Sequence, residues 1–221
     1  MRFRRCALAV AALALLPFPA APAAEECVVL EDFSAGAIGE LPPGWKLRSD
    51  EGRGVYTLRE EGGRRYLHAA STGIGIQAAK QITWDLGRYP VLAWSWRPVE
   101  FPKGSDERKA KTNDSALAVY GVFPYRMGTV RAVKYIWSEI VPVGTPELAS
   151  NMGLTQVSVL RSGTAGVGRW MDERVELLDN FRKRFGVSDT PRPGGIAVLT
   201  DADDTKSRAQ GDYASFRACA P

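Results

Sequence analysis

The sequence predicts a mainly β protein, an antiparallel β-sandwich with one amphipathic helix. Three observations support this fold class. Short apolar segments recur between turn residues, as in sandwiches and unlike alternating βα units. Residues 92–96 and 133–137 alternate with a period of two, which places Trp94, Trp96, Tyr135 and Trp137 on single strand faces. One segment near residue 180 has helical spacing instead.

The apolar segments predict ten strands. Residues 116–123 are apolar on both strand faces, which is typical of a central strand covered on both sides. In chain order the expected strands are Cys27–Phe33, Val55–Arg59, Tyr66–Ala70, Ile74–Asp85, Val91–Arg97, Ser115–Phe123, Val133–Ile140, Leu154–Arg161, Gly195–Thr200 and Tyr213–Ala218.

A helix is expected between residues 171 and 185. Its apolar residues recur at offsets of four, three, three and four, the stripe of an amphipathic helix. Acidic residues at the start and basic residues at the end complement the helix dipole, and Gly186 suits a left-handed cap. The stripe consists of Met171, Val175, Leu178, Phe181 and Phe185. Such a helix is expected to cover one edge or end of the sandwich.

The first 23 residues have the pattern of a secretory signal peptide. A basic start precedes an Ala/Leu-rich run too short to span a bilayer, and Ala21 and Ala23 suit a cleavage site. We therefore expect a signal peptide at 1–23, one domain at 24–221, and a periplasmic or secreted protein without a membrane span. Three of the 29 basic residues lie in the leader, against 25 acidic residues in all. The nearly neutral remainder gives no electrostatic reason to expect a nucleic-acid partner.

Two cysteines remain after the leader, one near each end of the exported chain. Export into an oxidising compartment favours a disulfide between Cys27 and Cys219. The alternative is a pair of free buried thiols. A cysteine nucleophile is disfavoured, because His68 is the only histidine that could serve as its base.

An acidic loop follows the strand expected at 195–200. Asp201, Asp203 and Asp204 offer hard oxygen ligands at a density that suits calcium, although the spacing is not that of an EF-hand. A turn in which the aspartates accept hydrogen bonds from backbone amides is the alternative. No other cofactor is indicated.

A charged loop leads into the predicted central strand. Arg108 and Asp114 could form an ion pair that orders the loop, and both are candidate ligand contacts. In a second hypothesis Glu107, Asp114 and Asp201 supply a carboxylate pair for acid/base cleavage of a glycosidic bond.

Six tryptophans complete the set of candidate residues. Exposed rings could stack on sugars, whereas core packing is the ordinary role of large aromatic residues. Trp94 and Trp96 share a face with Leu92, which favours the core. Trp45 and Trp170 adjoin glycine-containing turns, so we expect them to be exposed and to bind ligand.

The chain also resembles an uncharacterised secreted bacterial family, domain of unknown function 3047, over residues 31–216. The resemblance implies a jelly-roll-like sandwich, similar to galactose-binding-like or lectin-like modules, and implies no activity. The segments that carry it are Gly44–Lys46, Tyr66–Ala69, Tyr89–Pro90, Trp94–Trp96, Asp106–Arg108, Thr112–Ala116, Lys134–Ser138, Pro142–Thr145 and Thr200–Thr205.

These observations favour an exported envelope binding module for a glycan or another polyhydroxylated ligand. The sequence contains no nucleophile elbow, histidine metal cluster or phosphate-binding glycine loop. A carbohydrate-active hydrolase or lyase is the first alternative. The second is a structural protein that docks a protein partner through an edge strand.

Overall fold

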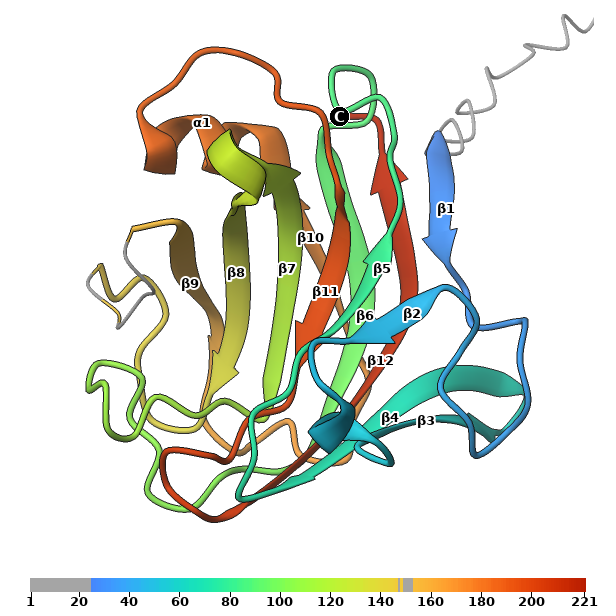
Figure 1. The fold of residues 1–221 in the computed structure, drawn as a ribbon, viewed down its shortest axis with the longest axis vertical. Helices are drawn as coiled ribbons and strands as arrows, with labels where there is room; N and C mark the ends of the chain where they lie inside the picture. The colour runs from blue at the N-terminus through green and yellow to red at the C-terminus, as the bar shows by residue number, and fades with distance from the viewer. Residues whose placement is uncertain (1–24, 147, 149–152) are drawn as a thin grey trace, which may run out of the picture.

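The computed structural model describes residues 25–146, 148 and 153–221. Over these residues the chain forms two β-sheets packed face to face, with one α-helix at an end of the sandwich (Figure 1). The expected class, a mainly β sandwich, is confirmed. The predicted leader lies outside the described residues. No helix in the described part of the chain is long and apolar enough to cross a membrane.

The first sheet is organised around the long C-terminal strand β12. One side of β12 pairs with β6, and its other side pairs first with β4 and then with β1. The order is β10-β6-β12-β4-β3, with β1 attached to β12. The strands are β1 (Cys27–Glu31), β3 (Tyr56–Glu61), β4 (Arg64–Thr72), β6 (Val91–Glu100), β10 (Met171–Glu176) and β12 (Arg208–Cys219).

The second sheet has the order β2-β5-β11-β7-β8-β9. As predicted from its two apolar faces, β7 is an interior strand, between β11 and β8. One pair departs from the expected antiparallel pattern, because β8 and β9 run parallel. The strands are β2 (Trp45–Leu47), β5 (Ala78–Gln81), β7 (Leu117–Pro124), β8 (Val130–Ser138), β9 (Thr155–Ser162) and β11 (Gly195–Leu199); single 3₁₀ turns lie at η1 (Asp50–Gly52) and η2 (Arg126–Gly128).

Aromatic side chains fill the space between the sheets. Trp94 and Trp96 of β6 are buried there as the alternation predicts, and Trp94 contacts Tyr135 of the opposite sheet at 5.7 Å between ring centroids. Trp45 also lies in this core, only 4% exposed, with Phe33 5.8 Å away and its Nε1 donating to Glu31. The expectation of an exposed Trp45 ring is therefore wrong, because a buried carboxylate satisfies its polar atom.

The segment 171–185 divides into two elements where the sequence predicts one helix. Met171–Glu176 is strand β10, paired with β6, and only Leu177–Phe185 forms the helix α1. Met171 and Val175 are four residues apart, an even offset that also places them on one face of a strand. The end of the helix agrees with expectation, since Gly186 adopts a left-handed φ of 62°.

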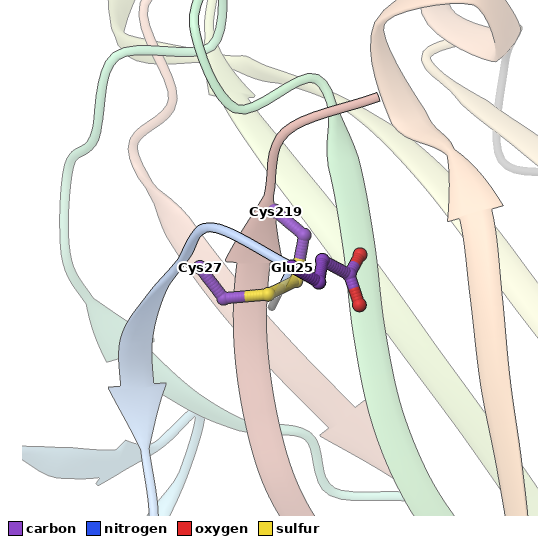
Figure 2. Close-up of side chains that lie close together, drawn as sticks. All are labelled: Glu25, Cys27 and Cys219. Atoms are coloured by element: carbon purple, nitrogen blue, oxygen red, sulfur yellow. A yellow bond between two sulfur atoms is a disulfide. The ribbon is translucent and has the colours of Figure 1, made fainter. Parts of the chain in front are cut away.

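The disulfide between Cys27 and Cys219 is present, as predicted (Figure 2). The two cysteines face each other in the register of the β1–β12 pair, so the bridge staples two strands that already pair. Glu25 lies beside them, but both sulfurs are bonded to each other and are not free to bind a metal. The bridge closes a loop of 192 residues in sequence separation.

We expect the double variant Cys27→Ala/Cys219→Ala to fold and to lose stability. Opening so long a loop restores chain entropy to the unfolded state, with an upper limit of about 5 kcal/mol in the free energy of unfolding. Urea unfolding followed by tryptophan fluorescence measures the loss. The unreduced wild-type protein should also resist alkylation. Two thiols that react without reductant would contradict the bridge.

Candidate functional site

A polar cavity of about 620 Å³ lies on the outer face of the second sheet. Its lining combines charged, amide and hydroxyl side chains with a wall of apolar ones. Strands β7, β8, β9 and β11, with loop residues next to the strand ends, contribute the residues. They include Arg48, Gln77, Asn113, Tyr120, Val122, Lys134, Thr155, Val157, Leu199, Asp201 and Asp204.

Strand alternation explains why these side chains face away from the core. Val119 of β7 and Val133 of β8 point into the space between the sheets, so Tyr120 and Lys134 point outward. The two are direct partners in the β7–β8 register. The Lys134 ammonium lies 5.7 Å from the centre of the Tyr120 ring, and Lys134 is only 7% exposed.

Two tyrosines reach across the core from the first sheet and hold the strand end that carries the acidic loop. The Tyr213 hydroxyl donates to the Leu199 carbonyl at 2.9 Å and also contacts the Thr200 hydroxyl at 2.9 Å. The Tyr56 hydroxyl accepts from the Thr200 amide at 3.2 Å. Burial raises the pKa of both phenols, so they stay neutral. The start of the loop at Asp201 is thus fixed from the core.

Three carboxyl groups gather beside this cavity, and Asp201 alone among them lines it. Oxygen atoms of Asp114, Asp201 and Asp203 lie within 4.8 Å of one another. Gly75 allows this, because a Cβ there would lie 2.2 Å from an Asp201 oxygen. Two of the three predicted calcium ligands, Asp201 and Asp203, thus lie together. The third member of the triplet is Asp114, which is distant in sequence, and Asp204 lies outside it.

Asp114 is fully buried and already has its donors. Its carboxylate accepts from the Asp204 amide at 3.1 Å, from the Thr205 amide at 2.7 Å and from the Thr205 hydroxyl at 2.5 Å. The acidic loop is thus held by an aspartate from outside it, and of the predicted turn within the loop there is one bond, from the Asp203 amide to Asp201 at 3.4 Å. The expected Arg108–Asp114 ion pair is wrong. Arg108 pairs with Asp106, at 2.7 Å between Nε and Oδ1, and does not line the cavity.

Burial, the largest cause, and the neighbouring Asp203 together raise the pKa of Asp201 to about 8. Lys134 acts in the opposite direction through its charge. Burial and the same acidic neighbours also raise the pKa of Asp204. At neutral pH Asp201 is therefore mainly a neutral carboxylic acid, hydrogen-bonded to Asp203.

Glu107 does not reach the cavity. It is 1% exposed, and the Ser115 and Ser138 hydroxyls donate to its two oxygens at 3.2 and 2.6 Å. Ser138 in turn accepts from the Val141 amide at 2.9 Å, so Glu107 orders two loops at the ends of β7 and β8. With Asp114 enclosed as well, neither carboxylate contacts a substrate in this arrangement. Of the three proposed acid/base residues, only Asp201 lines the cavity.

Trp170 lies on the outer face of the other sheet. Its partly exposed ring has the Arg64 and Arg97 guanidinium groups 4.7 and 4.8 Å from its centre and Tyr66 at its edge. Beneath it His68 is buried, with Nδ1 2.7 Å from Asp212, as expected of a structural histidine. Trp170, one of the predicted ligand contacts, thus lies on the other sheet and does not line the cavity.

Sequence reasoning missed most of the cavity lining, including Arg48, Gln77, Tyr120 and Lys134. Only Lys134 gave a signal that could have been used. The residues around Lys134 in its strand are apolar on both strand faces. A lysine in such a strand must find a partner or line a cavity. Arg48 and Gln77 come from loop segments, whose positions depend on the packing of the sheet.

The fold and cavity define a β-sandwich protein with a polar site on an outer sheet face. The chain belongs to the family described as protein of unknown function DUF3047, whose model matches residues 43–217. No curated protein sequence matches the chain.

Among solved structures, the chain is similar to TmCBM61 in complex with beta-1,4-galactotriose and to CBM28, a carbohydrate-binding module specific for non-crystalline cellulose. The first shares 8% identity over 80% of this chain and 88% of that chain, with a TM-score of 0.38. The second shares 12% identity over 89% and 95%, with a TM-score of 0.46. These likenesses concern the β-sandwich fold.

We expect Asp201→Asn to change how stability depends on pH. The wild-type carboxyl gains a proton on folding, so its contribution to stability is complete below about pH 4 and is lost as the pH rises through about 8. Without calcium, the stability of the wild type relative to the variant should fall between these values. Urea unfolding at several pH values measures the difference. Asp50→Asn, at an exposed site, is the control, and an unchanged difference would refute the raised pKa.

Calcium at the acidic loop stays a prediction, and its test is thermal unfolding with excess chelator or millimolar calcium. Three close carboxylates would supply part of a calcium coordination sphere. Binding to the folded state alone would add about 2.7 kcal/mol of stability at a hundredfold excess over Kd. Asp203→Asn should abolish the shift. Equal melting temperatures would mean that calcium does not bind this loop. The proton on Asp201 would then be what relieves the repulsion among the three carboxyl groups.

Proposed function

We propose that this protein is an exported binding module for a glycan or another polyhydroxylated ligand, held in the cavity on the outer face of the second sheet. The composition of that cavity is the observation that carries the proposal. Its size is within the range of small-molecule sites, and amide, hydroxyl and charged groups converge on it from four strands and the adjoining loops. Such donors and acceptors match the hydroxyl groups around a sugar ring.

The apolar wall supports the same ligand class. Val122, Val157 and Leu199 line the cavity beside the polar groups, and Tyr120 contributes ring edge and hydroxyl. Sugars present alternating C–H patches and hydroxyls, so a mixed lining suits them better than a uniformly charged one.

Export is supported by the leader-like start of the chain and by the disulfide, since such bridges persist in oxidising compartments.

Cleavage of a glycan is a second candidate function, favoured by one observation. Asp201 is a carboxylic acid that retains its proton near neutral pH, and a carboxyl in that state can serve as a general acid. Asp204 is the second carboxyl in the same cavity. This candidate replaces the earlier grouping of Glu107 with Asp114.

A glycan array tests the proposal, with two variants that separate the two sheet faces. Gln77→Ala removes a cavity amide and should weaken binding about tenfold, the cost of a hydrogen bond to a ligand. Trp170→Ala, on the opposite outer face, should leave binding unchanged.

The reverse result would move the site to Trp170 and contradict the proposal. Reducing-sugar assays on any bound glycan test cleavage. Product formed by the wild type and lost in Asp201→Asn, with affinity kept, would assign an enzyme.

A further inference from the structure

Positive charge gathers at the end of the sandwich that carries helix α1. Residues 125–131 and 177–194 include six basic residues against two acidic ones, Asp179 and Asp189, although the chain after the leader is nearly neutral. Within the part of the chain that the structure describes, none of the six forms an ion pair. We call this group the basic end, and its members are Arg126, Arg131, Arg182, Lys183, Arg184 and Arg192.

Side-chain contacts hold the segments of the basic end together. The Arg131 guanidinium lies 4.0 Å from the centre of the Tyr125 ring and 4.7 Å from the centre of the Phe185 ring, at the end of α1. The turn after β7 is thereby fixed beside the helix (Figure 1). The Arg182 side chain donates to the Asp189 carbonyl at 3.2 Å, which ties the loop after the helix to the same place. Cations that are distant in sequence therefore share one surface.

A single apolar side chain projects from this surface. Met127, in the 3₁₀ turn η2, is 99% exposed and has a left-handed φ of 54°. Hydrogen bonds fix the turn, since the Tyr125 amide donates to the Thr129 carbonyl at 2.8 Å and the Thr129 hydroxyl donates to the Arg126 carbonyl at 2.6 Å. A methionine enters this backbone region at a cost that glycine avoids. The turn thus presents to solvent an apolar side chain that adds no packing to the fold.

An anionic lipid surface matches this combination of charge and exposure. Basic side chains near a membrane are attracted to anionic headgroups, and apolar side chains among them enter the interface. A stable protein partner would need a wider apolar area, because such interfaces bury many residues on each side. A lone projecting methionine needs no complementary pocket in lipid. The basic end therefore favours a membrane surface over a protein.

We propose that the basic end docks this protein on an anionic membrane surface, with Met127 inserted at the lipid interface. The docking surface is separate from the glycan cavity, because Met127, Arg126 and Lys183 do not line that cavity. Val130, which follows the same turn, does line it. A docked protein would therefore hold this part of the cavity close to the lipid.

Co-sedimentation with lipid vesicles tests the docking, using the expected exported form, residues 24–221, because the apolar leader could itself bind lipid. The protein should bind vesicles of phosphatidylglycerol and phosphatidylcholine more strongly than phosphatidylcholine alone, and less strongly as salt rises. The double variant Arg126→Gln/Lys183→Gln should lower the partition coefficient about fivefold for each charge removed. Met127→Ser should lower it about tenfold through lost apolar burial.

The matched control for charge is Lys103→Gln/Lys111→Gln, which should bind as the wild type does. Both lysines are exposed in the loop that precedes β7, whereas the turn with Met127 follows β7. Insertion is read from an environment-sensitive dye on Met127→Cys, whose emission should shift to shorter wavelength on anionic vesicles. The same dye on Ile38→Cys, also an exposed apolar site, should not shift.

Three results would overturn the proposal. The first is equal binding, or none, to the two kinds of vesicle. The second is a loss of binding in the control variant as large as in Arg126→Gln/Lys183→Gln. The third is binding that Met127→Ser leaves unchanged, with an unshifted dye at position 127.

Discussion

The contact of two buried tyrosine hydroxyls with the end of β11 is the constraint on which the candidate site depends. Tyr56 and Tyr213 belong to one sheet, and Thr200 belongs to the other. Because a buried phenol must find hydrogen-bond partners, each fixes the opposite backbone at a definite point. That point is one residue before Asp201. The core thus holds the sheets together and also determines where the acidic loop begins.

Carboxylates in this protein divide into two kinds by their surroundings. Glu107 and Asp114 accept hydrogen bonds from hydroxyls or amides and act as internal ties for loops. Asp201 lacks such donors in equal number, lies near two other carboxylates and keeps its proton. A carboxyl group is therefore structural in one place and available for chemistry in another place nearby. Burial is common to all three, so the supply of donors makes the difference.

The outer faces of the two sheets carry different chemistry. On the first sheet the polar groups are mutually satisfied, with Asp212 bridging His68 and Arg97, and Trp170 covering the arginines. On the second sheet, cations and carboxyl groups line one cavity together, Lys134 and Arg48 with Asp201 and Asp204. A self-satisfied network stabilises the fold, whereas charged groups around an open volume are typical of a ligand site.

The sequence by itself determined the sandwich class, the interior strand β7, the aromatic faces of β6 and β8, and the disulfide, because strand periodicity and cysteine placement are local signals. It predicted helix at β10 because an offset of four suits both structures. Only the tertiary structure decided that Trp45 is buried and that Asp114 caps the acidic loop. It also decided that Tyr120, Lys134 and Arg48 line one cavity. Those contacts join segments far apart in the chain, and their geometry follows from sheet register and packing, which no local pattern encodes.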